Sequence, residues 1–145
     1  LLYRFKSQDI NGKKVLKVNE KYYAADHGLR EAVIGANLQN VEIILENIVG
    51  LELLRRGYKV CVGRVGTTEI DFVGEKQGDK LYIQVCCLLS DEATIQREFG
   101  PLLEVRDNYP KIVLYQEGSF RGNYEGIPAM RIEDWLMEEV SKHGQ

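Results

Sequence analysis

The segment that most constrains the fold is the nearly apolar run at residues 81–88, Leu-Tyr-Ile-Gln-Val-Cys-Cys-Leu. It is far shorter than the roughly 18 residues that a membrane-spanning helix needs, and its length suits a strand. A strand without a polar face has to be covered on both sides, so it belongs in the middle of a sheet. The run therefore predicts an α/β fold in which a mixed central sheet has helices on both faces.

The segments around this run supply those helices and further strands. Asn40 is expected to cap the first helix and Gly57 to end it, while Ser90 is expected to cap the second, which Gly100-Pro101 would kink or split. The strands before and in the apolar run are expected to form an antiparallel meander, and the strand after the second helix to run parallel to its neighbour. The predicted elements are a helix at 41–56, strands at 58–64, 68–73 and 81–88, a helix at 90–105, strands at 111–115 and 126–130, and a helix at 132–141.

Residues 1–40 differ in character from the remainder. Extended pieces at 1–6, 15–18 and 21–25 predict a small antiparallel lead-in rich in β-structure, followed by a short helix at 29–34. Residues 41–145 are expected to form the main α/β domain, in one compact unit with the lead-in. Because the sequence opens at Leu1 in what resembles the middle of a strand, we expect it to be part of a longer protein.

Composition indicates the cellular compartment of the protein and the kinds of partner that it can bind. The cysteines Cys61, Cys86 and Cys87 are odd in number and form no Cys-x-x-Cys pair, which predicts buried thiols in a reducing, cytoplasmic compartment rather than disulfides or a zinc site. No apolar run is long enough for a membrane span. A net charge of −3 gives no general attraction to nucleic acid, so contact with DNA would require a local basic patch.

Four basic residues at the end of the first helix and on the next strand are the candidates for such a patch. They are Arg55, Arg56, Lys59 and Arg64. Charged side chains at a helix end are more often solvated or paired with a neighbouring charge than bound to nucleic acid. Glu52, four residues before Arg56, is such a neighbour.

Three residues are candidates for chemistry. Glu46 lies opposite the apolar stripe Ile44/Ile48/Leu51, on a helix face that is itself partly apolar. The alternative is an ordinary carboxylate whose hydrogen bonds are satisfied.

Asp71 falls between Ile70 and Phe72, where strand alternation would place it on the opposite face from both. Pairing with Arg64 is the competing explanation for this carboxylate. Alternation also places Gln84 on the same face as Cys86, and hairpin pairing could bring this face beside Asp71. Two carboxylates and a carbonyl oxygen suit Mg²⁺ or Mn²⁺, which could activate water for attack on a phosphate.

This helix Glu, strand Asp and Gln84-Val85-Cys86 triplet in an αβββαβ order resemble the PD-(D/E)xK, or restriction-endonuclease-like, nuclease superfamily. More narrowly, the segments 45–57, 69–73 and 82–85 resemble the C-terminal domain of unknown function of prokaryotic AAA-type ATPases. The resemblance implies a nuclease-like fold attached to an ATPase module of the same longer chain. Glu46 and Asp71 match the acidic positions, whereas Gln84 replaces the second acid and Cys86 replaces the lysine.

Three functions follow from these observations. The favoured one is a degenerate, nuclease-like accessory domain that binds a partner or nucleic acid. The first alternative is an active Mg²⁺- or Mn²⁺-dependent DNA endonuclease. The second is a purely structural or dimerisation module, with a second copy of the chain as partner.

Overall fold

The described strands form one mixed sheet in the order β2-β1-β3-β4-β5-β6-β8-β7. The computed structural model describes residues 2–11, 14–24 and 38–143, with side chains at 5–11 and 41–138; the helix expected at 29–34 lies outside these ranges. The strands are β1 (Leu2–Asp9), β2 (Lys14–Ala24), β3 (Lys59–Val65), β4 (Thr68–Lys76), β5 (Asp79–Leu88), β6 (Lys111–Glu117), β7 (Asn123–Tyr124) and β8 (Ile127–Arg131). The helices are α2 (Leu38–Arg55), α3 (Glu92–Leu103) and α4 (Ile132–His143).

The order α2-β3-β4-β5-α3-β6 confirms the expected αβββαβ core and agrees with a restriction-endonuclease-like α/β fold. The strands β3, β4 and β5 form the predicted antiparallel meander, and β6 runs parallel to β5. The apolar segment is the central strand β5, in which every residue from Tyr82 to Cys86 is buried. The lead-in strands β1 and β2 pair antiparallel as predicted, and β1 also joins the main sheet by running parallel to β3.

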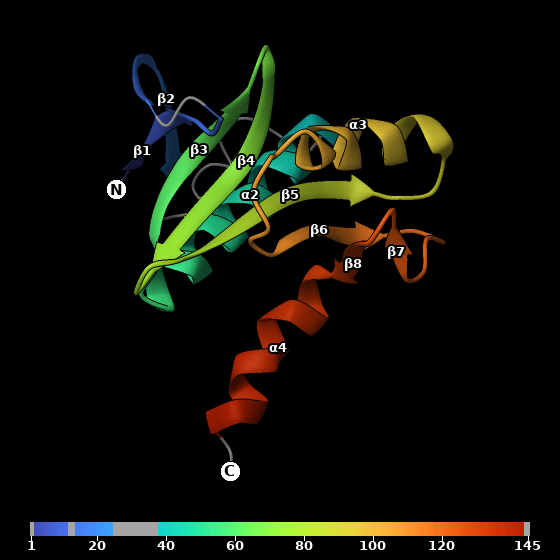
Figure 1. Cartoon of the computed structure of the whole chain (residues 1–145). Helices are drawn as coiled ribbons and strands as arrows, with labels where there is room; N and C mark the ends of the chain where they lie inside the picture. The colour runs from blue at the N-terminus through green and yellow to red at the C-terminus, as the bar shows by residue number, and fades with distance from the viewer. Residues whose placement is uncertain (1, 12–13, 25–37, 144–145) are drawn as a thin grey trace.

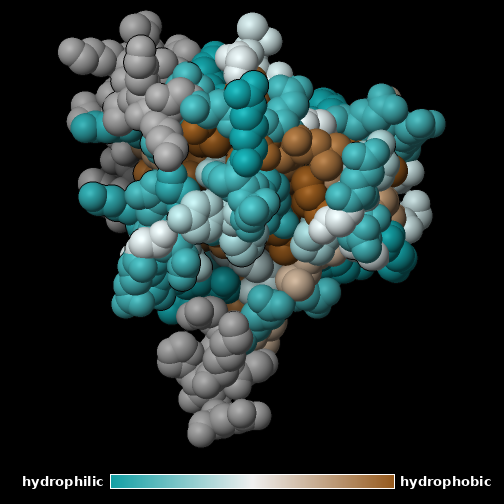
Figure 2. Space-filling view, viewed as in Figure 1, coloured by the Kyte–Doolittle hydropathy of each residue, from teal (hydrophilic) through white to brown (hydrophobic). Residues whose placement is uncertain are grey.

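Helices cover the two faces of the sheet, with α2 behind it and α3 in front in the view of Figure 1. The α2-side core consists of Phe5, Leu45, Val49, Leu53, Val62, Phe72, Ile83, Val85, Leu114, Ile132 and Trp135. The α3-side core consists of Ile10, Val65, Ile70, Val73, Tyr82, Cys86, Leu89, Phe99, Leu102, Val105, Val113, Tyr115 and Ile127. Figure 2 shows hydrophilic residues over most of the front face, with hydrophobic residues visible between them near α3.

The ends of the helices correct the sequence analysis in three places. The helix α2 begins at Leu38, so Asn40 lies within the first turn and is not its cap. Asp91 rather than Ser90 caps α3, because its carboxylate accepts the Thr94 N–H at 2.7 Å. The helix α3 is neither split nor interrupted at Pro101, since the proline falls in the last turn. Gly57 ends α2 as predicted, with φ of +90°.

Besides the packing of Ile132 and Trp135 in the α2-side core, the residue that follows the last residue of α2, Arg56, bonds to α4. The Arg56 guanidinium lies 4.0 Å from the centre of the Trp135 ring and donates to the Trp135 carbonyl oxygen at 2.8 Å. The same guanidinium pairs with Glu52 at 3.0 Å, which confirms the pair expected from their spacing. Within the described residues, no helix has both the length and the apolar character needed to cross a membrane.

Candidate functional site

The structure brings Glu46, Asp71 and Gln84 to one cleft with a volume of about 360 Å³. The cleft lies where β4 and β5 part, because β4 continues along β3 while β5 turns toward β6 (Figure 1). The helix α2 contributes residues from one side and α3 from the other. The lining residues are Glu42, Glu46, Thr68, Glu69, Asp71, Gln84, Val85, Arg97, Glu98 and Pro101.

Two reciprocal hydrogen bonds join Asp71 to β5 at the point of divergence. The last backbone pair of β4 and β5 is Phe72 with Ile83. Beyond it, the Asp71 N–H donates to the Gln84 side-chain oxygen at 2.8 Å, and the Val85 N–H donates to the Asp71 carboxylate at 2.8 Å. These two hydrogen bonds to side chains thus extend the pairing of β4 and β5 beyond the last backbone-paired residues. The sequence-based expectation that pairing brings Gln84 beside Asp71 is confirmed, and both residues have a structural role there.

A β-bulge in β4 sets the direction of Asp71. Opposite Cys61 and Gly63 of β3, which are two residues apart, β4 places Val73 and Ile70, which are three apart. As a result, Ile70 belongs to the α3-side core and Phe72 to the α2-side core. The predicted alternation, with both residues opposite Asp71, is therefore wrong. Bulges commonly redirect a side chain beside a functional site, and this one turns Asp71 into the opening between the strands.

The position of Glu46 on α2 follows from the packing of the helix. The stripe that packs in the α2-side core is Leu45, Val49 and Leu53, whereas Ile44, Ile48 and Leu51 are only half-buried. Glu46 is half-buried and lies at the border of the packed stripe, one residue after Leu45. This border position directs it into the cleft beside β4 and β5.

Glu98 is the cleft residue that the sequence analysis missed. Its exposed fraction is only 7%. Burial raises the pKa of its carboxyl from 4.5 to about 7, against the hydrogen bond and charge of Arg97 and with a further rise from Glu42 and Glu46. Its position offered a signal, because Glu98 follows Ile95 by three residues and precedes Leu102 by four, on the apolar face of α3.

Cys86 occupies the β5 position where the resemblance predicts a lysine, and its side chain is fully buried. Its exposed fraction is 0%, and it belongs to the α3-side core. Burial, and next the charge of Glu98, raise the pKa of the Cys86 thiol. A neutral, enclosed thiol supplies neither a cation nor a reactive thiolate. The expectation that every cysteine is buried is wrong for Cys61 and Cys87, which are half-buried free thiols.

The donor set of the cleft does not fit the metal site that the resemblance implies. In the described part of the chain, His, Cys, Asp and Glu side chains form no group of three placed to hold one ion. The Gln84 oxygen and one Asp71 oxygen already accept backbone N–H groups. Among the described residues that line the cleft, the one basic side chain is Arg97, which bonds to Glu98 at 3.1 Å.

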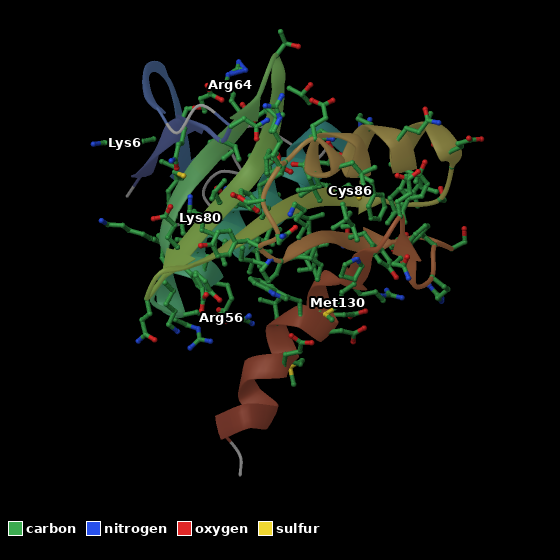
Figure 3. The ribbon with its side chains drawn as sticks, viewed as in Figure 1. Lys6, Arg56, Arg64, Lys80, Cys86 and Met130 are labelled. Carbon is green, nitrogen blue, oxygen red and sulfur yellow. The ribbon has the colours of Figure 1, made fainter. Side chains whose placement is uncertain are left out.

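The four candidate basic residues do not form one continuous patch. Arg55 and Arg56 both pair with Glu52, and Arg56 is largely covered by Trp135. Lys59 and Arg64 lie near opposite ends of β3, and Figure 3 places Arg56 and Arg64 at opposite ends of the sheet. A role for these residues in nucleic-acid binding stays a prediction.

Comparisons with known proteins give one relative and one solved structure of note. No family model matches the chain. An uncharacterized protein of Haemophilus influenzae is 41% identical over 138 residues, covering 95% of this chain and 34% of that protein. The chain thus spans about a third of the length of this curated relative. A solved structure of a type III CRISPR defence DNA nuclease activated by cyclic oligoadenylate is similar over 72% of this chain and 20% of the nuclease chain, with 17% sequence identity and a TM-score of 0.44.

Proposed function

We propose that this domain is a nuclease-like accessory domain that does not cleave phosphodiester bonds and instead binds a partner of the ATPase machinery to which it belongs. The observation that carries the proposal is the enclosed Cys86 at the position where an active site would need a lysine. Without a cation at this position of β5, no side chain there orients the nucleophile or balances charge that develops on a phosphate.

The charge of the cleft supports the same conclusion. Among the described residues that line it, five carry carboxyl groups, and Arg97 carries the single guanidinium; the five are Glu42, Glu46, Glu69, Asp71 and Glu98. Even with the Glu98 carboxyl partly protonated near neutral pH, carboxylates outnumber the cation. A DNA phosphate that approached this opening would meet like charge in a partly buried setting, where screening by salt is weak. The partner is therefore expected to bind through other surfaces of the domain.

The link to an ATPase rests on the sequence. The segments 45–57, 69–73 and 82–85 resemble the C-terminal domain found behind prokaryotic AAA-type modules. The length of the Haemophilus relative, about three times that of this chain, leaves room for such a module. Coupling of the domain to ATP hydrolysis is part of the proposal.

A cleavage assay tests the proposal. Branched, nicked and single-stranded DNA would be incubated with the domain in Mg²⁺ or Mn²⁺, beside Asp71→Asn and the surface control Glu104→Gln. We expect the wild type to cleave no faster than Asp71→Asn on any substrate. Robust cleavage that Asp71→Asn abolishes and Glu104→Gln retains would overturn the proposal.

One observation favours an active nuclease as a second candidate. Arg97 lies in the cleft and could act as a relocated cation, although it bonds to Glu98 at 3.1 Å and lies 3.9 Å from Glu42. If this alternative holds, Arg97→Ala abolishes cleavage together with Asp71→Asn. If the accessory role holds, Arg97→Ala leaves the absence of cleavage unchanged.

A further inference from the structure

A second cavity, with a volume of about 430 Å³, lies on the sheet away from the cleft. Lys6 and Gln8 of β1, Lys59 and Cys61 of β3, and Glu75 of β4 line it. Strand alternation places these five side chains on the same face of the sheet as α3, since Ile10 and Val73 belong to the α3-side core and Cys61 packs against it. The helix α3 itself packs over β4, β5, β6 and β8. The cavity therefore lies beside the helix, on the part of this face that β1 and β3 form.

The lysines of the cavity differ from the other described lysines. Lys76 donates to the Arg56 carbonyl oxygen, Lys111 donates to two carbonyl oxygens, and Lys80 pairs with Glu75. Within the described part of the chain, Lys6 and Lys59 are the two lysines without a hydrogen bond or ion pair, and both line this cavity. Both are exposed, and Figure 3 shows Lys6 extending outward from β1. The two ammonium groups are therefore available to a ligand.

The carboxylate that lines the cavity, Glu75, forms an ion pair with a lysine on the neighbouring strand β5. Glu75 is paired in register with Lys59 on one side and with Lys80 on the other, so the three form a row across β3, β4 and β5. The Glu75 carboxylate takes Lys80 as its partner at 3.3 Å. Lys59 is left as the unmatched positive charge of the row.

The remaining polar side chains offer a further donor. The Cys61 thiol donates to the Gln8 side-chain oxygen at 3.3 Å. This bond occupies the acceptor of the Gln8 amide and leaves its NH₂ group available. Among the described side chains that face the cavity from the α3 side of the sheet, the free groups are thus two ammonium groups and an amide NH₂, which are all donors.

We propose that this cavity binds the phosphate group of a small phosphorylated molecule. Two unmatched ammonium groups fit a phosphate monoester, which carries about 1.5 to 2 negative charges near neutral pH. The volume lies in the range of small-molecule sites, and the apolar stems of the lysines offer contact to the rest of the ligand. The site is independent of the cleft and of the proposed accessory function.

Phosphate binding can be measured by NMR on the intact 145-residue chain. Inorganic phosphate and adenosine monophosphate would be titrated at constant ionic strength, and shifts of backbone amides would locate the site. We expect saturable shifts centred on residues 6–8 and 59–61. Lys59→Gln should weaken binding about tenfold, as expected for the loss of one charged hydrogen bond. Arg121→Gln removes an exposed positive charge on the loop between β6 and β7 and should leave the affinity unchanged.

A change that tightens binding gives a sharper test. Glu75→Gln removes the one carboxylate among the described residues that line the cavity and should strengthen phosphate binding several-fold, whereas Glu138→Gln removes an exposed carboxylate on α4 and should not. Shifts that do not saturate, or equal effects of each variant and its charge-matched control, would overturn the site. Tighter binding of a short single-stranded oligonucleotide than of adenosine monophosphate at these residues would overturn the small-molecule ligand.

Discussion

Glu98→Gln should change how the stability of the domain depends on pH. In the folded chain the pKa of Glu98 is raised from 4.5 to about 7 by burial, while Arg97 lowers it and the Glu42 and Glu46 carboxylates of α2 raise it further. The unfolded chain therefore loses this proton at lower pH than the folded chain does. The contribution of Glu98 to stability is complete below about pH 4.5, declines as the pH rises, and is lost above about pH 7.

The size of the effect follows from the two pKa values. Between about pH 5 and about pH 8, titration of this one carboxyl costs the folded state about 2.5 kcal/mol. Urea unfolding of wild type and Glu98→Gln at both pH values would measure it, with the exposed Glu104→Gln as control. The wild type should lose about 2.5 kcal/mol more than Glu98→Gln over this interval. Parallel pH profiles for wild type and Glu98→Gln would refute this explanation of the buried acid.

Two further substitutions test contacts that position the elements. Asp71→Ala leaves the Val85 N–H without its acceptor and should lower the free energy of unfolding by about 2 kcal/mol. Asp71→Asn should lower it much less, because the amide oxygen can still accept this hydrogen bond. Equal losses for the two variants in urea unfolding would contradict this. Arg56→Ala removes the stacking on Trp135 and the bond to its carbonyl oxygen, and should cost about 2 kcal/mol. Arg55→Ala, at an exposed ion pair, should cost less than about 1 kcal/mol, and a cost similar to that of Arg56→Ala would show that α4 is not fixed in this way.

The order of the elements could be predicted from the sequence because it depends on local patterns. Apolar residues at helical spacing identified α2 and α3, and the run at 81–88 identified the central strand. The exact first and last residues of the helices were harder to predict from the sequence. Whether Ser90 or Asp91 caps α3 depends on which carboxyl or hydroxyl oxygen reaches the Thr94 N–H, and two neighbouring capping residues give the same sequence signal.

The cleft could be predicted in part. Glu46, Asp71 and Gln84 were identified because each is polar within an apolar segment, and all three line the cleft. The β-bulge at Asp71 could not be predicted, since it arises from the register with β3 and leaves no local pattern. Glu98 was within reach of the sequence, as a carboxylate on the apolar face of a helix.

The central claim is that the cleft retains the form of a nuclease site but does not hold the metal ion that cleavage would need. Paramagnetic broadening of backbone amides by Mn²⁺ tests this most directly, because it locates the ion and is insensitive to contaminating nuclease. The proposal predicts weak, non-saturating broadening spread over surface carboxylates, identical in wild type and Asp71→Asn. Saturable broadening centred on Asp71 and Gln84, and lost in Asp71→Asn, would contradict it.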